Sequence, residues 1–197
     1  PENKSVVSGQ VLQNPYTFEQ ARLVVREMAD SLALDLVDKG LLTDQLVLTV
    51  GYDIENTAGG SYHGEIVTDR YGRKIPKHTH GTANLPRKTS SARSITDAVL
   101  GVYDAKVNPK LSIRRLTITA NRLVGEDTVQ QEPEAPVQFN LFDNVEVQEQ
   151  RLREEEAKLK RERKIQEAML DIKKKFGKNA ILNGGSYLEG ATAKERN

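Results

Sequence analysis

The sequence predicts an α+β domain in which a four-stranded sheet, with the element order βαββαβ, carries two helices on one face. Two stretches begin with capping residues and repeat apolar residues every three or four positions, as amphipathic helices do. Strand-like segments flank and separate them, and some alternate apolar with polar residues. Because both helices belong to one face, the opposite face of the sheet is expected to have no covering element.

The N-terminal segments predict a strand followed by a long helix. Residues 5–13 (SVVSGQVLQ) alternate Val and Ser, with Gly9 as a bulge or twist point, and a turn is expected at residues 14–15. Thr17 and Gln20 have capping-box spacing, and Gly40 predicts the helix end. The apolar positions of this helix are Ala21, Val24, Val25, Met28, Leu32 and Leu36.

The middle of the chain predicts a second strand, a connection and a third strand. Residues 44–53 (DQLVLTVGYD) alternate, so that one face of the strand looks inward. The inward residues are Leu46, Leu48, Val50 and Tyr52, and the other face carries Gln45, Val47 and Thr49. Residues 53–75 contain Gly59 and Gly60 and predict an extended connection or a long hairpin tip. A third strand is expected over residues 77–85.

A second helix and a last strand complete the predicted domain. Ser90 or Ser91 can cap the helix, and residues 108–109 (Asn-Pro) end it. Its apolar positions are Ile95, Ala98, Val99, Val102 and Tyr103. The last strand, within residues 113–124, is expected to bury Leu116, Ile118 and Ala120 and to expose Arg115, Thr117, Thr119 and Asn121.

The rest of the chain differs in composition and divides the sequence into four predicted parts. These are a folded domain (1–124), an acidic linker (125–144), a long charged helix (145–176) and a Gly-rich tail (177–197). Apolar residues repeat every seven positions in the first half of the helix and shift to another stripe from Ile165, which argues against a continuous coiled coil. We interpret it as a solvated helix with one apolar patch near its end, formed by Ile165, Met169, Ile172 and Phe176.

Composition excludes several classes of protein. The 197 residues include no Cys, so neither disulfides nor thiolate metal sites are possible, which fits a reducing cytoplasm. No apolar run is long enough for a membrane span, and the N-terminus lacks a signal pattern, so a soluble, cytoplasmic protein is expected. The sequence begins PENKS without Met, which suggests a trimmed piece of a longer protein.

A basic stretch suggests a nucleic-acid partner. Residues 70–93 contain seven Lys or Arg residues and no acid, and Arg114, Arg115 and Arg122 add to them. Alternation would put about half of these bases on the uncovered sheet face, beside Thr, Ser and Asn side chains. Such donors suit phosphate oxygens, which are contacted without regard to base sequence. A solubilising charge run is the plainer alternative.

Three segments, in this order, resemble the little finger domain of Y-family translesion DNA polymerases. They are KSVVSGQVL, HGTANLPRKTSSARSITDAVL and IRRLTITANRL, and the resemblance covers residues 1–124. It implies an error-prone polymerase of DNA repair whose little finger grips the DNA backbone. The residues that it implies for DNA binding are Lys4, Ser5, Ser8, Lys88, Thr89, Arg114 and Arg115, and Lys77 of the basic stretch is expected to join them. FGKNAIL and EGAT in the tail are similar to Gram-positive members linked to UV damage.

The linker motif QFNLFD, residues 138–143, is similar to the peptide with which bacterial polymerases bind the sliding clamp. Apolar side chains in a polar linker mark an interaction site, and such a peptide must leave its own domain to enter a groove on a partner. The resemblance implies that Gln138 forms hydrogen bonds, while Leu141 and Phe142 fill an apolar pocket.

Catalysis is not expected from this chain alone. The palm, fingers and thumb are absent, so the two Mg²⁺ ions of the reaction are expected in the longer polymerase and no cofactor is expected here. A clamp-tethered DNA-binding adaptor without a polymerase segment is the alternative function. A metal-dependent hydrolase built on His63, His78 and His80 is a third, although no Cys or nearby acid completes the set.

Overall fold

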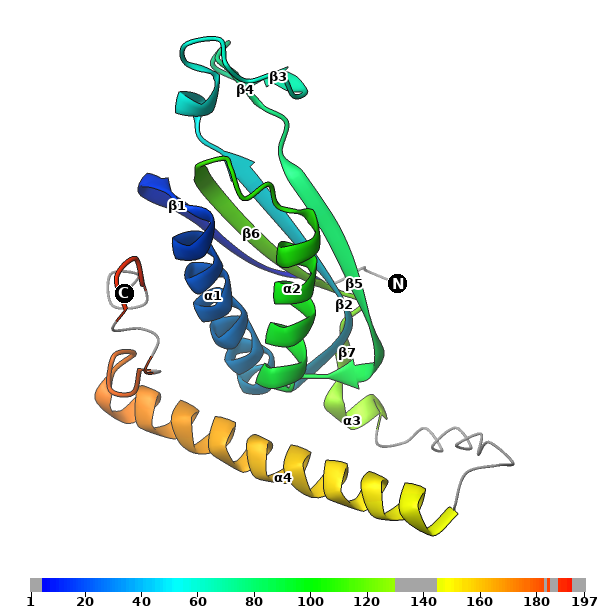
Figure 1. The fold of residues 1–197 in the computed structure, drawn as a ribbon. Coiled ribbons are helices and arrows are strands. Elements are labelled where there is room, and N and C mark those ends of the chain that lie inside the picture. Colours follow the sequence, from blue (N-terminus) through cyan, green and yellow to red (C-terminus); the bar gives the residue numbers. More distant parts are fainter. Residues whose placement is uncertain (1–4, 130–144, 183, 185–187, 193–197) are drawn as a thin grey trace.

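The computed structural model describes residues 5–129, 145–182, 184 and 188–192, and its centre is an antiparallel sheet (Figure 1). The main strands lie in the order β1 (Val6–Tyr16), β6 (Ile113–Asn121), β2 (Leu41–Tyr52) and β5 (Thr79–Thr89). The short strand β7 (Val124–Gly125) pairs with the first residues of β2. The predicted α+β class and βαββαβ order are therefore confirmed.

Two helices, α1 (Phe18–Asp38) and α2 (Ala92–Lys106), lie side by side over one face of the sheet (Figure 1). Thr17 and Gln20 form the predicted capping box of α1, and Ser91 caps α2 by accepting the backbone N–H of Ser94. Gly40 has a φ of 60°, the left-handed conformation that ends a helix at low cost when the residue is glycine. These local signals were therefore sufficient to place both helix starts.

The core lies between the sheet and the helix pair. The two central strands, β2 and β6, each turn every second side chain toward the helices, as their alternation predicted. The predicted inward residues of both strands and all six predicted apolar positions of α1 are buried. Arg22 of α1 and Asp104 of α2 join the helices through two 2.8 Å contacts, and hydrogen bonds from Arg22 lower the pKa of Asp104.

Several predicted strand boundaries differ from the structure, including the start of β2, which lies at Leu41 and not at residue 44. The turn expected at residues 14–15 is wrong, because β1 continues to Tyr16 and a register shift against β6 between Val11 and Tyr16 absorbs the irregularity. The third long strand, β5, begins at Thr79 and extends to Thr89, beyond the predicted end at residue 85.

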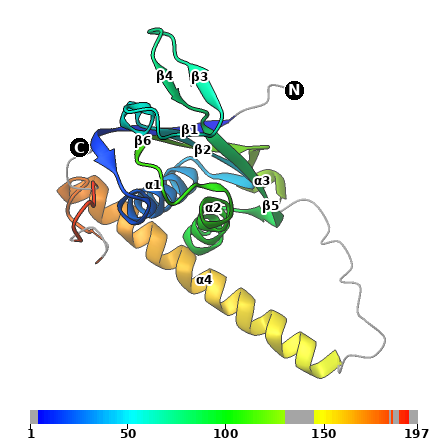
Figure 2. The same cartoon turned by 45° about the horizontal axis from the view of Figure 1, so that its top comes forward.

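The connection between β2 and β5 is a projecting hairpin. Of the two forms predicted for residues 53–75, the hairpin tip is therefore the one observed. It begins with the short helix η1 (Ile54–Thr57), after which β3 (Ile66–Thr68) pairs with β4 (Lys74–Pro76). The Thr57 hydroxyl donates to the backbone oxygen of Lys74 at 2.7 Å, which ties η1 to the hairpin. Figures 1 and 2 both show the hairpin beyond the end of the main sheet.

The long helix α4 (Val145–Phe176) follows the short α3 (Glu126–Val129), and it docks on the domain. Figure 2 shows α4 crossing α1 and α2 on the side away from the sheet. Glu162 accepts the Ser91 hydroxyl and the Arg93 backbone N–H, both at 2.8 Å. The side-chain amide of Gln166, which is 4% exposed, donates to the backbone oxygen of Ser90 at 3.0 Å.

The interpretation of α4 as a solvated helix is therefore wrong for its second half. Within the predicted apolar patch, Met169 and Ile172 are half-buried, whereas Ile165 and Phe176 are 60% and 67% exposed. Several of the docking contacts are hydrogen bonds, which hydrophobic periodicity cannot reveal. Lys174 of α4 also pairs with Asp38 at the end of α1. No helix among the residues described is both long and apolar enough to span a membrane.

Part of the C-terminal tail also packs on the domain. The backbone N–H of Thr192 donates to Glu27 of α1 at 2.9 Å, and its hydroxyl contacts Gln10 of β1 at 3.3 Å. Both Thr192 and Glu27 are buried. The EGAT segment, which includes Thr192, therefore joins the edge of the sheet to the outer side of α1.

Gly81 is predicted to be required for the packing of α2 against β5. A Cβ added at Gly81 would lie 2.6 Å from Cγ1 of Val102, so the Val102 side chain, α2 or β5 must shift. We expect Gly81→Ala to destabilise the fold by about 1–3 kcal/mol and to lower the Tm by about 2–4 °C per kcal/mol. Thermal unfolding measured by circular dichroism checks this.

Gly101→Ala is the matched control, because a Cβ there has no atom within 4 Å and α2 gains helix propensity. It should raise the Tm slightly. The double variant Gly81→Ala with Val102→Ala should recover part of the loss. Equal melting of the Gly81→Ala and wild-type chains would contradict the proposed clash.

Candidate nucleic-acid interface

The side of the sheet opposite α1 and α2, here called the open face, has no covering element within the described ranges. The strand registers place its side chains in rows that cross the sheet. One row runs from Val7 through Thr119 and Val47 to Thr82, and the next runs from Gly9 through Thr117 and Thr49 to His80. These rows form a continuous surface across all four strands.

The side chains of the open face are neutral or basic. The hydrophilic ones are Gln13, Gln45, Thr49, His80, Thr82, Asn84, Arg115, Thr117, Thr119 and Asn121. None of the described side chains on this face is an acid or a large aromatic ring. Hydroxyl, carboxamide and guanidinium groups donate well to phosphate oxygens, whereas a face without Phe, Tyr or Trp among its described side chains offers little platform for base stacking.

Arg115 is the cation of the open face, and it lies in the row of this face nearest the hairpin end of the sheet. Its strand neighbours are Val11 of β1 and Gly51 of β2. A Cβ at position 51 would lie 3.2 Å from the Cβ of Arg115, so glycine there leaves room for the arginine stem. Arg115 is exposed and forms no ion pair with any residue that the structure describes. Its guanidinium is therefore available to an anionic ligand.

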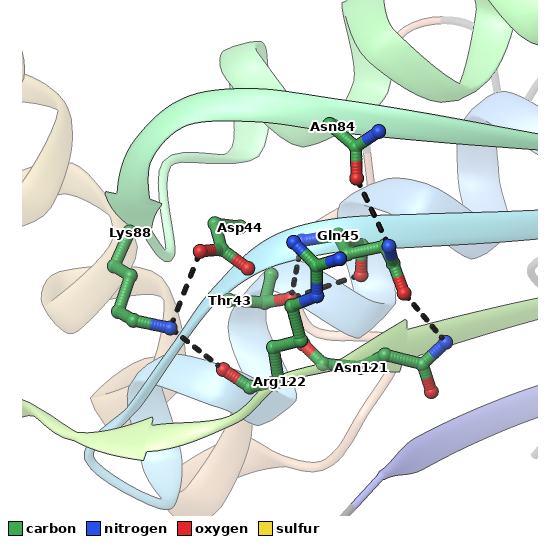
Figure 3. A network of polar contacts seen from close by, with 7 residues as sticks. All are labelled: Thr43, Asp44, Gln45, Asn84, Lys88, Asn121 and Arg122. Carbon is green, nitrogen blue, oxygen red and sulfur yellow. Dashed lines mark hydrogen bonds and ion pairs between the residues drawn. The ribbon is translucent and has the colours of Figure 1, made fainter.

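A row of carboxamides crosses the open face beside the threonine rows (Figure 3). The side-chain amide of Gln45 donates to Oδ1 of Asn84 at 2.9 Å, and that of Asn121 contacts Oε1 of Gln45 at 3.4 Å. Thr43, which is fully buried, donates to the backbone oxygen of Asn121 at 2.6 Å. These contacts link β6, β2 and β5 and hold the amides in a fixed orientation.

Arg114 was predicted to bind DNA together with Arg115, but the structure places it outside the open face. Gly51 pairs with Arg115 and Tyr52 with Ile113, so Arg114 occupies an irregularity in β6. Its Nη1 lies 3.7 Å from Oδ2 of Asp53, at the hairpin end of the sheet. The structure therefore separates the two adjacent arginines, and only Arg115 points from the open face.

Lys88 and Thr89 are engaged in contacts within the domain. The Lys88 ammonium lies 3.3 Å from Oδ2 of Asp44 and donates to the backbone oxygen of Arg122 at 3.0 Å (Figure 3). The hydroxyl of Thr89 accepts the backbone N–H of Ser91 at 3.0 Å. Both residues therefore hold the end of β5 in place, and their predicted phosphate contacts would have to compete with these bonds.

The remaining predicted DNA-binding residues are scattered. The Lys77 ammonium lies 3.0 Å from both carboxylate oxygens of Glu65 at the base of the hairpin. Ser8 pairs with the buried Ile118, so it faces the helices, whereas Ser5 is exposed just before β1. Lys4 lies outside the described residues. The structure does not bring these residues together into one surface, and their DNA-binding roles stay predictions.

The open-face residues of β2 and β5 were missed as site residues. Alternation already separated Gln45 and Thr49 from the buried face of β2. The missing information was the strand order, which places β2 between β6 and β5 and makes their polar faces continuous. The predicted clamp-binding residues Gln138, Leu141 and Phe142 lie outside the described residues.

The histidines proposed as metal ligands do not form a ligand cluster. The rings of His78 and His80 are 6.1 Å apart between centroids. Throughout the described part of the chain, no group of three or more His, Asp or Glu residues is placed to hold a metal ion. His80 is instead one polar member of the open face, opposite Thr49.

The fold defines a class of α+β domain in which one sheet face is packed on helices and the other is left available. The family model described as "impB/mucB/samB family C-terminal domain" matches residues 3–138. The chain belongs to this family, which confirms the predicted resemblance to the C-terminal region of Y-family DNA polymerases.

A solved structure described as "Complex of beta-clamp processivity factor and little finger domain of PolIV" is similar at 10% identity and a TM-score of 0.40. The similarity covers 71% of this chain and 100% of that chain. No curated protein matches the sequence significantly.

Lys88 is predicted to contribute to stability. The Lys88→Ala change would remove the cation beside Asp44, whose Oδ1 is buried without a hydrogen-bond partner among the described residues. We expect a loss of about 1–3 kcal/mol, measured as a lower midpoint in urea unfolding. Arg115→Ala is the control and should leave the midpoint nearly unchanged. Equal midpoints for both variants would show that the Lys88 contacts are not stabilising.

Proposed function

We propose that this chain is the DNA-holding domain of a Y-family translesion DNA polymerase, and that its open face binds the phosphate backbone of duplex DNA. The observation that carries the proposal is Arg115, which is exposed, forms no ion pair with any described residue, and lies next to the threonine rows on a face whose described side chains include no acid. Hydroxyl and amide donors can position a backbone without reading its bases. Family membership supports the same function.

The rigidity of the open face supports contact with a regular duplex. Its four strands are paired along most of their length, and the carboxamide row is fixed by hydrogen bonds between strands. A preorganised array of donors loses little conformational entropy when it binds. The backbone of a duplex repeats regularly, so a fixed array can engage several phosphates at once.

The domain should bind duplex DNA weakly, without sequence preference and with strong dependence on salt. A few phosphate contacts predict that log K falls with log salt at a slope of about −3 to −6. Arg115→Ala should weaken binding to unrelated duplexes equally and reduce the slope by about 1. Fluorescence anisotropy across a salt series measures both quantities.

The control for this experiment is Arg153→Ala. Arg153 lies on α4, its side chain is 81% exposed, and the change removes the same charge away from the open face. It should leave both the affinity and the slope nearly unchanged. Binding that is insensitive to salt, or equally weakened by both variants, would overturn the phosphate-binding proposal.

We further propose that the linker recruits the polymerase to the bacterial sliding clamp through QFNLFD, residues 138–143. The support is the sequence itself, in which Leu141 and Phe142 are apolar residues within an acidic linker. DNA as the partner and the absence of Cys favour a cytoplasmic protein in DNA repair. Synthesis itself would depend on palm carboxylates elsewhere in the longer polymerase.

A peptide of residues 134–145 should bind the clamp about as well as the intact chain. Burying Leu141 and Phe142 is worth about 1.5–3 kcal/mol each, so replacing both with Ala should weaken binding at least about a hundredfold. Gln138→Ala should cost less. Calorimetric titration of the clamp with each chain measures this.

Melting curves provide the control for the clamp experiment. The double variant should melt with the wild type, because the linker is proposed to contribute nothing to the core. A double variant that melts several degrees lower, with no heat of clamp binding for either chain, would make this segment part of the fold instead of a recruitment motif.

A further inference from the structure

The tip of the β3–β4 hairpin exposes an aromatic ring close to two arginines. Tyr71 is 66% exposed, and the hairpin extends beyond the end of the sheet in both views (Figures 1 and 2). The guanidinium carbons of Arg70 and Arg73 lie 4.8 and 5.1 Å from the centroid of the Tyr71 ring. This ring fills no part of the core, so its packing does not explain its presence.

Hydrogen bonds around Asp69 hold the tip in one conformation. Its Oδ1 accepts the backbone N–H groups of Tyr71 at 2.8 Å and Arg73 at 3.0 Å, and its Oδ2 accepts Nε of Arg73 at 2.8 Å. These bonds, that of the Arg73 backbone foremost, lower the pKa of Asp69. Gly72, with a φ of 77°, supplies the tight turn. The loop that carries the ring, and the Arg73 guanidinium, are therefore held in a fixed arrangement.

The hairpin also carries an excess of positive charge. Asp69 pairs with Arg73 at 2.7 Å, and Glu65 pairs with Lys77 at 3.0 Å. Arg70 and Lys74 form no ion pair with any described residue, so two cations on the hairpin remain uncompensated. A fixed aromatic ring beside free cations is suited to a ligand with both a π-face and negative charge.

We propose that the hairpin tip binds an unpaired nucleotide of single-stranded DNA next to the duplex, with its base on Tyr71 and its phosphate on Arg70. The open face lacks a large aromatic ring among its described residues, so the tip supplies stacking that this face cannot. The proposal deepens the proposed function and rests on it for the neighbouring duplex. An acidic peptide would satisfy the cations but would leave the ring without a stacking partner.

The experiment compares a blunt duplex with the same duplex bearing a short single-stranded overhang. The overhang contains 2-aminopurine, a fluorescent base whose emission changes on stacking. Tyr71→Ala should lower affinity for the overhang DNA about tenfold and abolish the fluorescence change, because one base–aromatic stack is lost. Tyr71→Phe should keep both, and neither variant should alter affinity for the blunt duplex.

Phe176→Ala is the matched control, because Phe176 is an equally exposed ring with a neighbouring cation. It is 67% exposed at the end of α4, and the Lys175 ammonium lies 5.2 Å from its centroid. This variant should bind both DNAs as the wild type does. Melting curves of every variant should coincide with the wild type, since none of these rings is in the core.

Several results would overturn the inference. These are equal losses on blunt and overhang DNA, a Phe variant as weak as the Ala variant, and displacement of overhang DNA by polyglutamate as efficiently as by single-stranded DNA. The proposed function is tested separately, by the affinity of the domain for the blunt duplex alone. Tyr71-dependent overhang binding without blunt-duplex binding would overturn that function while supporting the hairpin contact.

Discussion

Burial of one face of the two central strands is the constraint on which the rest of the structure depends. β2 and β6 place Leu46, Leu48, Leu116 and Ile118 against the helices, and every one of these side chains is buried. Since side chains alternate along a strand, the intervening threonines and carboxamides must face the other way. The composition of the open face is thus a consequence of the same register that forms the core.

Periodicity and capping residues predicted most of the fold. The DNA-binding residues were harder to predict, because their contacts depend on residues far away in the sequence. Strict alternation in β6 placed Arg115 correctly, but the irregularity at Arg114 depends on how β1 and β2 pair with that strand. The engagement of Lys88 with Asp44 likewise depends on the β2–β5 register. A charge count along the chain cannot distinguish a cation already paired within the domain from one that is free.

The docking of α4 illustrates a second limit of sequence patterns. Its helical character follows from composition, but Gln166 is buried against a backbone oxygen of Ser90 while Ile165 beside it is exposed. Burying an amide is favourable only when a specific partner satisfies it, and that partner lies far away in the sequence. Hydrophobicity therefore identifies only part of the docking face, because Met169 and Ile172 are half-buried while Ile165 and Phe176 are exposed.

The strand order has a consequence for how the chain folds during synthesis. β6 is the last of the four long strands to be made, yet it lies between β1 and β2. Until β6 arrives, the inner edges of β1 and β2 have no partner in this sheet, and unpaired edges favour association with other chains. Completion of the sheet is thus delayed until most of the domain has left the ribosome, and contacts of such long range favour slow folding.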